Sequence, residues 1–315
     1  RRVLLKLGDV VDRQQPDVVV LIDFPGFNMR FAEILKRKGI PCVYYFSPSV
    51  WAWGRSRAER VAETATKVVA VFSFEYDVYK EVGADVEFVG HPLLDIVPER
   101  IPPAQARSRL GLSDKEPVIA LLPGSRRQEI KGILPTMLKA VRLLEQEIPG
   151  IMPVVAVAQG TMEEDIRQMG SGSEFGERLK IIQGQTHTVL SASDLAVITC
   201  GTATLEAALL GIPQVAVYRT SSSTYYAAKL LVKIPYVALP NIVAGRQIIP
   251  ELLQNEATPA NISTNLARIW QEDERQRMQA DYDEMRRLLG EKGAIARAAR
   301  IVLDVAKDKG RTKQV

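Results

Sequence analysis

One segment of this 315-residue chain combines a glycine turn with hydroxyl and carboxylate side chains. In residues 195–207, LAVITCGTATLEA, an apolar run ends at Gly201 and a helical pattern begins at Thr202. The free N–H groups and the positive dipole end of a helix favour a phosphate. Thr202 and Thr204 would add hydroxyl donors, and Glu206 suits a bidentate grip on ribose hydroxyls. By itself, the pattern fits a capped strand–helix junction equally well.

A second segment repeats this arrangement with basic side chains. Residues 120–130, ALLPGSRRQEI, read as a strand, a glycine turn and a helix that begins near Ser125 and Arg126. A guanidinium group at such a turn suits a diphosphate leaving group through charge-assisted hydrogen bonds. The segment lacks both the GxGxxG and the GK[ST] fingerprints, and Arg127 fits a solvated helix start.

A carboxylate follows the first strand-like run. In residues 18–28, VVVLIDFPGFN, Asp23 stands at the end of a β-branched run, and Pro25 and Gly26 require a turn directly after it. The carboxyl ends of strands are where doubly wound sheets place ligands and chemistry. Asp23 could act there as a general base, or it could only cap the next helix.

Two further segments carry weaker signals. Trp51 and Trp53, with Arg55 and Arg57 close behind, could form an amphipathic wall for a sugar or an acyl chain. Aromatic residues of a hydrophobic core explain the two tryptophans as well. His91 lies just before a proline-rich stretch, where a single histidine is weak evidence for acid–base chemistry.

Strand and helix patterns alternate along the chain, which predicts doubly wound α/β domains. Apolar runs predict strands at residues 18–22, 42–46, 67–72, 86–89, 118–122, 152–157, 195–199 and 214–218, with a short strand at 180–182. The continuous β-branched run at 18–22 is expected to be buried on both faces of a parallel sheet. Helices are expected at residues 1–15, 29–38, 55–64 and 74–82, from the turn at 123–126 to about residue 147, and at residues 202–210, 225–233, 249–253, 260–290 and 294–307. Four prolines within residues 92–103 predict a linker, so the ligand is expected in a cleft between two domains.

Composition limits the classes of function. The net charge of +4, from 41 basic and 37 acidic residues, indicates a mixed, solvated surface and gives no indication of nucleic-acid binding. Two cysteines, without CxxC spacing, predict free thiols, and the two histidines make a histidine-based zinc site improbable. We therefore expect no cofactor and no metal. No apolar run reaches the length of a membrane-spanning helix.

Taken together, these motifs resemble one known family, lipid-A-disaccharide synthase. The resemblance rests on IDFPGFN, YYFSPSVWAW, FVGHPLLD, LLPGSR, GTATLEA and VALPNIVAGRQIIPELLQ, in this order, and runs from about residue 12 to 255. It implies a metal-independent glycosyltransferase of α/β class and GT-B type, with two Rossmann-like doubly wound domains and a cleft between them. It implies inverting transfer of 2,3-diacylglucosamine from its UDP donor to the 6-hydroxyl of 2,3-diacylglucosamine 1-phosphate, at the cytoplasmic face of the bacterial inner membrane.

The resemblance also implies roles for individual residues. Asp23 falls on the family's general base. Ser125 and Arg126 fall on the GSR turn near the UDP phosphates. The nucleotide turn is carried by Gly201, Thr202 and Glu206, with Glu206 a ribose ligand. Six other motif residues are assigned only to the cleft, namely Asn28, Ser47, Trp51, His91, Asn241 and Arg246.

The chain departs from the family at its start. The family's opening strand and its G-E-x-S-G-D turn have no counterpart in these residues, so we expect a fragment with an incomplete N-terminal domain. The expected domains are residues 1–95 on the acceptor side, 96–285 for the UDP-sugar, and 286–315 as a helix that packs back on the first domain. Peripheral membrane contact and a homodimer with exchanged C-terminal segments are further expectations.

Other readings of the same residues stay open at this point. One is another UDP-sugar enzyme, such as a UDP-GlcNAc 2-epimerase or a peptidoglycan N-acetylglucosaminyltransferase. Another is a UDP-binding module without a finished acceptor site.

Overall fold

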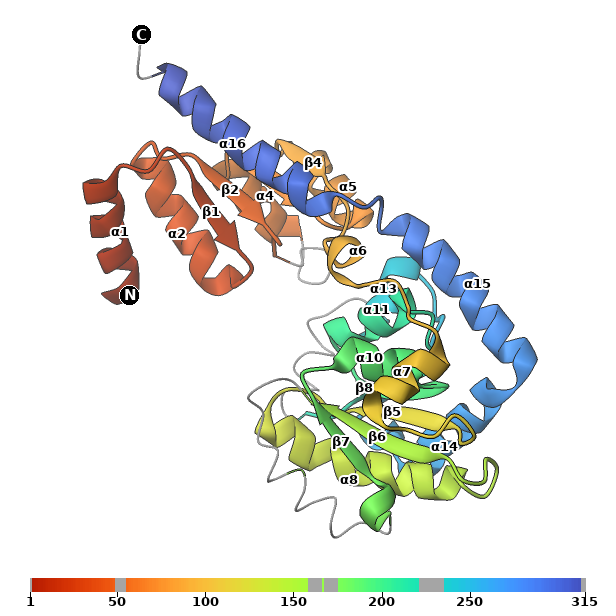
Figure 1. Cartoon of the computed structure of the whole chain (residues 1–315). Helices are drawn as coiled ribbons and strands as arrows, with labels where there is room; N and C mark the ends of the chain where they lie inside the picture. The colour runs from red at the N-terminus through yellow and green to blue at the C-terminus, as the bar shows by residue number, and fades with distance from the viewer. Residues whose placement is uncertain (1, 49–54, 158–165, 167–174, 221–234, 313–315) are drawn as a thin grey trace. The chain divides into compact units, whose positions relative to one another are not determined.

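The computed structural model describes residues 2–48, 55–157, 166, 175–220 and 235–312 (Figure 1). Two compact units are formed. Unit 1 comprises Arg1–Ile96 and Arg287–Val315, and unit 2 is built from Val97–Leu230 and Ile234–Arg286. Each unit contains one parallel β-sheet with helices, as the alternating pattern predicts.

The sheet of unit 1 has four parallel strands in sequence order, from β1 to β4. They are β1 (Val19–Ile22), β2 (Cys42–Tyr45), β3 (Lys67–Ala70) and β4 (Val86–Phe88). The side chains of one sheet face form a core with helices from the first part of the chain. These helices are α1 (Arg2–Gln14), α2 (Pro25–Arg37), α4 (Arg55–Thr64) and α5 (Ser73–Glu81), while α6 (Leu93–Ile96) follows the last strand.

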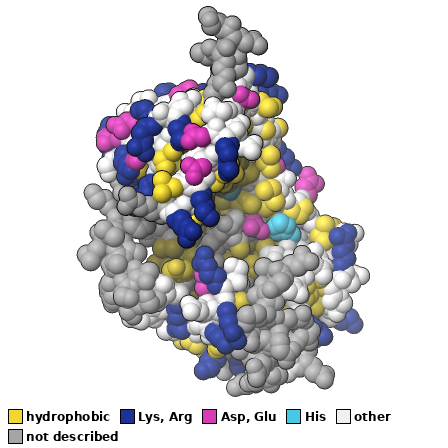
Figure 2. Space-filling model, turned by 90° about the vertical axis from the view of Figure 1, so that its left-hand side faces the viewer, with side chains coloured by type: hydrophobic (Ala, Val, Ile, Leu, Met, Phe, Trp, Pro, Cys, Tyr) yellow, Lys and Arg dark blue, Asp and Glu magenta, His cyan; other side chains and the backbone are white. Residues whose placement is uncertain are grey.

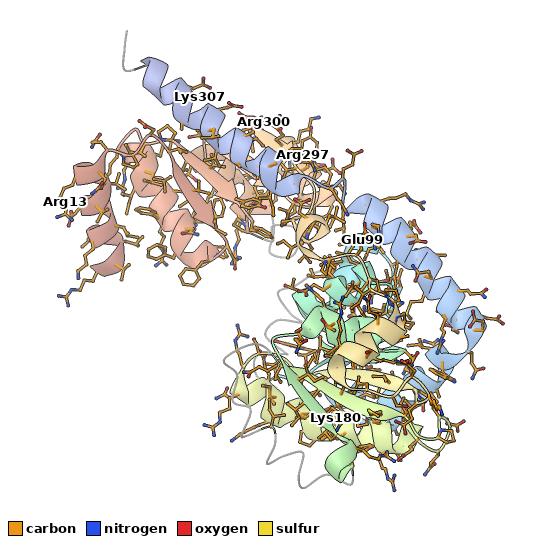
Figure 3. All side chains as sticks on the ribbon, viewed as in Figure 1. Arg13, Glu99, Lys180, Arg297, Arg300 and Lys307 are labelled. Carbon is orange, nitrogen blue, oxygen red and sulfur yellow. The ribbon has the colours of Figure 1, made fainter. Side chains whose placement is uncertain are left out.

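Helix α16 (Ala294–Thr312) covers part of the second face of this sheet. Its Ala298 and Ile301 pack in one cluster with Val43 of β2, Val69 of β3 and Val89, which follows β4. The predicted helix at residues 294–307 is confirmed and extends further. Figure 3 shows Arg297, Arg300 and Lys307 at successive positions along it.

Two sets of hydrogen bonds fix the start of α16 on unit 1. The guanidinium group of Arg297 donates to the Val89 carbonyl oxygen from Nε at 3.0 Å and from Nη2 at 2.7 Å. The carboxylate of Asp95 accepts from the N–H groups of Gly293 at 2.5 Å and Ile295 at 2.9 Å, and so binds donors at the helix N-terminus. The last helix is therefore an integral part of unit 1.

Strand β1 departs from the prediction of burial on both faces. Leu21 is buried, but Val20 is 38% exposed and Ile22 is 57% exposed. The cause is position: β1 is the edge strand, and α16 packs on the inner strands of that face. Only the face that carries Val19 and Leu21 contributes to a core.

Unit 2 has a six-stranded parallel sheet in the order β10-β9-β8-β5-β6-β7. The strands are β5 (Val118–Leu122), β6 (Met152–Val157), β7 (Lys180–Gln183), β8 (Leu195–Thr199), β9 (Gln214–Tyr218) and β10 (Glu251–Leu253). The helical segments are α7 (Pro103–Leu110), α8 (Arg127–Leu144), η1 (Gly176–Arg178), α10 (Thr186–Ala192), α11 (Thr202–Leu209), α13 (Leu239–Ala244), η2 (Gln254–Glu256), α14 (Pro259–Trp270) and α15 (Glu272–Leu288). Helix α15 crosses the boundary into unit 1.

The central strands of unit 2 are buried on both faces. All five residues of β5 are buried, as are four of the five residues of β8. The prediction of a helix at residues 249–253 is wrong, because Glu251–Leu253 pairs in parallel with β9 as strand β10. The segment is too short to show the periodicity of a helix or a strand in its sequence. Pairing with the free edge of β9 decides its conformation.

Basic and acidic side chains are interspersed on the face that the space-filling view presents (Figure 2). Within the described ranges, no helix combines the length and the apolar character needed to cross a bilayer.

Candidate functional site

In unit 2, two of the predicted motifs lie at one edge of the sheet. The chain order reverses between β5 and β8, which are parallel neighbours with Leu122 opposite Ile198. Parallel strands lie about 4.8 Å apart, so the loops that follow β5 and β8 leave the same edge as neighbours. In open α/β sheets such a switch point is where ligands bind.

The turn after β8 presents Gly201, Thr202 and Glu206 as predicted. Gly201 precedes the first residue of α11, and both it and Thr202 are exposed. Thr202 and Glu206 are four residues apart on α11, so they share one face of that helix. The positive N-terminal end of α11 and the Glu206 carboxylate, one turn further along, therefore lie on the same side of this helix.

Thr204 does not offer its hydroxyl to a ligand. Its side chain is completely buried, and Oγ1 donates to the Gly201 carbonyl oxygen at 2.7 Å. The prediction of a second hydroxyl donor at this turn is therefore wrong. Thr204 instead closes the turn that positions Gly201.

Glu206 has a partner that the sequence did not reveal. Nε2 of His187, on α10, lies 2.7 Å from Oε2 of Glu206, and both side chains are half-buried. Helix α10 begins three residues after β7 ends, so His187 comes from the same sheet edge. The imidazole restricts one carboxylate oxygen, and the other oxygen remains available to a ligand.

The turn after β5 holds Ser125 and Arg126 at the start of α8. Gly124 has φ 107°, a backbone conformation that residues with a Cβ rarely adopt, so this turn requires glycine. The Arg126 side chain is 82% exposed, and its Nη1 lies 2.8 Å from Oε1 of Glu129. Exposed ion pairs are worth about 0–1 kcal/mol, so a phosphate could replace this carboxylate.

In unit 1, Asp23 stands where β1 ends, and its backbone is strained. Asp23 has φ 48° and Phe24 has φ 44°, both in the left-handed region that non-glycine residues seldom adopt. Asp23 is exposed, and no described residue donates a hydrogen bond to its carboxylate. Backbone strain of this kind is concentrated at functional sites.

Two side chains stabilise this strained backbone. Nδ2 of Asn28 donates to the carbonyl oxygens of Ile22 at 2.9 Å and Asp23 at 2.7 Å. The Tyr44 hydroxyl donates to the Asp23 carbonyl oxygen at 3.2 Å. Burial, and to a lesser degree the charge of Asp23, raises the pKa of Tyr44, so its hydroxyl keeps the proton that it donates. Asn28 therefore positions Asp23 through the backbone.

His91 fits a packing role better than acid–base chemistry. It is only 4% exposed, and its ring lies 4.9 Å from that of Phe72 and 6.1 Å from that of Phe46, centre to centre. Its Nδ1 accepts a hydrogen bond from the Leu93 N–H at 3.2 Å. Burial lowers the pKa of His91 to about 4, so the ring is neutral near pH 7.

The structure also places the other residues that the motifs assign to the cleft. Asn241 is completely buried inside unit 2. Arg246 forms ion pairs with Asp281 and Glu284 of α15, at 2.8 and 2.6 Å. Ser47 is buried in unit 1. Trp51 and Trp53 lie outside the described residues, as does the helix expected at residues 225–233.

Among the described residues, no group of three or more histidine, cysteine or carboxylate side chains could hold a metal ion. The chemical groups brought to the two sheet edges are a strained, exposed carboxylate in unit 1 and, in unit 2, a helix N-terminus, an arginine and a carboxylate. The second set suits a nucleoside diphosphate, because it offers charge to phosphates and an acceptor to ribose hydroxyls.

Comparisons with known proteins give consistent results. Residues 3–305 match the family model described as Lipid-A-disaccharide synthetase. The chain is 41% identical over 305 residues to Lipid-A-disaccharide synthase of Myxococcus xanthus, covering 96% of this chain and 79% of that one. It is 37% identical to the enzyme of the same name from Syntrophus aciditrophicus, covering 97% and 80% of the two chains.

Solved structures show a similar fold at low sequence identity. A structure of MnaA from S. aureus with UDP matches with a TM-score of 0.62 and 14% identity, over 95% of this chain and 78% of that one. At this identity the match concerns the fold, two Rossmann-like units of GT-B type.

Proposed function

The chain belongs to the lipid-A-disaccharide synthase family, and from this premise we propose how its side chains carry out the transfer. It is a glycosyltransferase that uses a UDP-sugar donor and a lipid acceptor and forms the lipid A disaccharide. The observation that carries this conclusion is the family match over residues 3–305. In detail, the donor unit is 2,3-diacylglucosamine and the acceptor is 2,3-diacylglucosamine 1-phosphate.

We assign the general base to Asp23. Its exposed carboxylate would take the proton of the acceptor 6-hydroxyl as that oxygen attacks the anomeric carbon of the donor. The bond from the anomeric carbon to the UDP oxygen breaks as the new bond forms. A single displacement inverts the anomeric centre and requires no covalent intermediate on the protein.

We assign the donor's nucleotide to the switch point of unit 2. The N–H groups at Gly201 and Thr202 and the side chains of Ser125 and Arg126 would bind the diphosphate and stabilise its charge as UDP leaves. Glu206 would accept hydrogen bonds from the ribose hydroxyls, with His187 positioning the carboxylate. Arg126 would exchange its contact with Glu129 for one with phosphate.

The ribose assignment predicts a selective loss of affinity. Glu206→Ala should weaken UDP binding by about 1.5–3 kcal/mol, because the charge-assisted hydrogen bond from a ribose hydroxyl to its available oxygen is lost. His187→Ala should have a smaller effect in the same direction, of about 0.5–1 kcal/mol. Calorimetry with UDP and with 2′,3′-dideoxy-UDP would measure both.

The dideoxy ligand is the internal control for that prediction. Its affinity should not change in either variant, and Glu147→Gln, at an exposed site of unit 2, should bind both ligands like the wild type. An equal loss of affinity for both ligands would exclude ribose as the group that Glu206 contacts.

The function itself is tested by supplying two donors separately. With UDP-2,3-diacylglucosamine and the acceptor, we expect UDP and the β-1,6-linked disaccharide 1-phosphate, detected by mass spectrometry. With UDP-GlcNAc alone we expect no reaction. Consumption of only UDP-GlcNAc would favour an epimerase or another N-acetylglucosamine enzyme, and UDP binding without any transfer would favour a binding module.

The remaining assignments concern organisation and location. Residues 1–95 are proposed as the acceptor side, 96–285 as the UDP-sugar domain and 286–315 as a helix that packs back on the first. Because both substrates carry acyl chains, we propose peripheral contact with the cytoplasmic face of the inner membrane, where the exposed Val3 and Leu5 of α1 could contribute. The α16 of a second copy could occupy the same place on unit 1, which would give a homodimer with exchanged C-terminal segments.

A further inference from the structure

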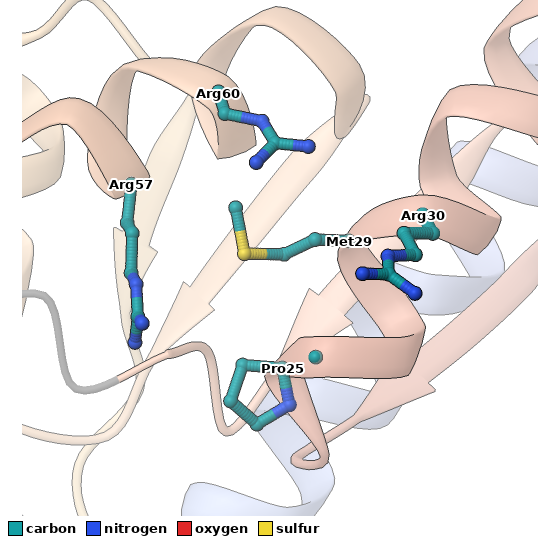
Figure 4. Close-up of a pocket in the computed structure, with 6 residues that line it drawn as sticks. Pro25, Met29, Arg30, Arg57 and Arg60 are labelled. Atoms are coloured by element: carbon teal, nitrogen blue, oxygen red, sulfur yellow. The ribbon is translucent and has the colours of Figure 1, made fainter.

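A small basic pocket opens in unit 1 at the start of α2. Its volume is about 170 Å³, and it is lined by Pro25, Gly26, Met29, Arg30, Arg57 and Arg60. The three arginines come from α2 and α4, and their guanidinium groups lie around the buried Met29 with Pro25 beside them (Figure 4). The volume is roughly that of five water molecules in the liquid, which is enough for a phosphate group.

The start of α2 adds to the positive potential of this pocket. Pro25 and Gly26 are the first two residues of the helix, and the Gly26 N–H has no backbone acceptor within the described chain. A Cβ on Gly26 would meet nothing within 4 Å, so the Cα of this residue borders open space. A helix N-terminus with free amide donors attracts anions, and arginine is the preferred partner of phosphate.

The lining of the pocket carries basic side chains, and none of its six residues is acidic. The Glu33 carboxylate lies outside the lining and forms an exposed ion pair with Arg60, at 2.6 Å. Such a pair is readily exchanged for a dianion that several arginines contact together.

We propose that this pocket binds the phosphate group of the acceptor sugar 1-phosphate. The inference rests on the proposed function, because Asp23, the proposed base, stands two residues before Pro25. A sugar held by its phosphate beside the start of α2 would thus be tethered close to the carboxylate that must reach its hydroxyl. Tethering of this kind lowers the entropic cost of bringing the reacting groups together.

The test compares the acceptor with its analogue that lacks the 1-phosphate. Arg30→Gln, Arg57→Gln and Arg60→Gln should each raise the acceptor KM about tenfold or more, with the donor KM unchanged. The wild type should itself have a raised KM for the dephosphorylated analogue, and the three variants should raise it little further. Arg37→Gln, at the exposed far end of α2, is the matched control and should keep the wild-type KM values.

Arg30→Gln is the decisive variant, because Arg30 is exposed and its substitution leaves the fold intact. Equal losses with both acceptors would overturn the proposal. So would Arg30 variants that keep the acceptor KM but no longer sediment with phosphatidylcholine vesicles containing phosphatidylglycerol, since the pocket would then hold a membrane headgroup. A wild type that binds UDP but transfers to neither acceptor would contradict the proposed function itself. That result differs from the two results above, which contradict only the phosphate site.

Discussion

Asp23→Asn should lower kcat about a thousandfold and leave the affinity for UDP unchanged. Removal of a general base costs typically 10²–10⁴ in rate. Asparagine has the same shape as aspartate but cannot accept the proton of the acceptor hydroxyl. The hydrogen bonds of Asn28 and Tyr44 go to the backbone carbonyl oxygen of residue 23, so the substitution should leave the strained turn in place.

The measurement combines steady-state transfer with calorimetric titration of UDP. Asp17→Asn is the matched control, because Asp17 is exposed in the same unit just before β1. It should have wild-type kinetics. If Asp23→Asn retained the wild-type kcat, the base would have to be another group, and the strain at residues 23 and 24 would need another explanation.

Asn28 supports the same turn, and Asn28→Ala would remove that support. Asn28 touches no reacting atom in the proposed mechanism, and its two hydrogen bonds hold the backbone beneath Asp23. Its role is therefore positional. The left-handed conformation at Asp23 and Phe24 is compatible with neither a strand nor a helix, so β1 ends at Ile22 and α2 begins only at Pro25.

The sequence predicted well those features that depend on local patterns. Continuous apolar runs placed β5 and β8 at their observed bounds, and the glycines after them placed both turns at the carboxyl ends of the strands. The carboxyl ends of parallel strands lie at one edge of the sheet. Once the strands were predicted, the positions of the motifs in the fold therefore followed. The positions of Ser125, Arg126, Gly201, Thr202 and Glu206 were thus predictable, while their roles remain predictions.

Contacts between distant segments were not predictable in this way. His187 lies in no motif, and only the topology of unit 2 brings it to Glu206. Strand β10 forms because β9 offers an edge, which residues 249–253 do not reveal. The basic pocket also required the structure, since Arg30 is separated in sequence from Arg57 and Arg60 and meets them only when α2 and α4 pack.

Asn241 illustrates how a motif residue can serve the fold. The motif assigned it to the cleft, but its side chain is completely buried. Its Oδ1 accepts from the N–H groups of Ile248 at 2.7 Å and Ile249 at 2.9 Å. Its Nδ2 donates to the Ile249 carbonyl oxygen at 2.9 Å and to Oε1 of Glu251 at 2.7 Å. All four hydrogen-bonding positions of the amide are used.

Asn241→Ala should lower the free energy of unfolding of unit 2 by about 4 kcal/mol. Two buried backbone N–H groups would lose their acceptor, and each unsatisfied group costs about 1–3 kcal/mol. Glu251 would also lose a donor, although its carboxylate still accepts from the N–H groups of Val237 and Ala238. Urea unfolding of the variant and the wild type, followed by circular dichroism, would measure the loss.

The control is Gln276→Ala, an exposed amide on α15 whose removal should change the free energy of unfolding by less than about 0.5 kcal/mol. Asn241→Asp gives a second comparison, because it keeps the acceptor oxygen but places a carboxylate beside Glu251, so it should also be destabilising. A variant with wild-type stability and lost transfer would contradict the structural role. Asn241 would then have to contact a substrate, and its burial in the unliganded chain would have to change on binding.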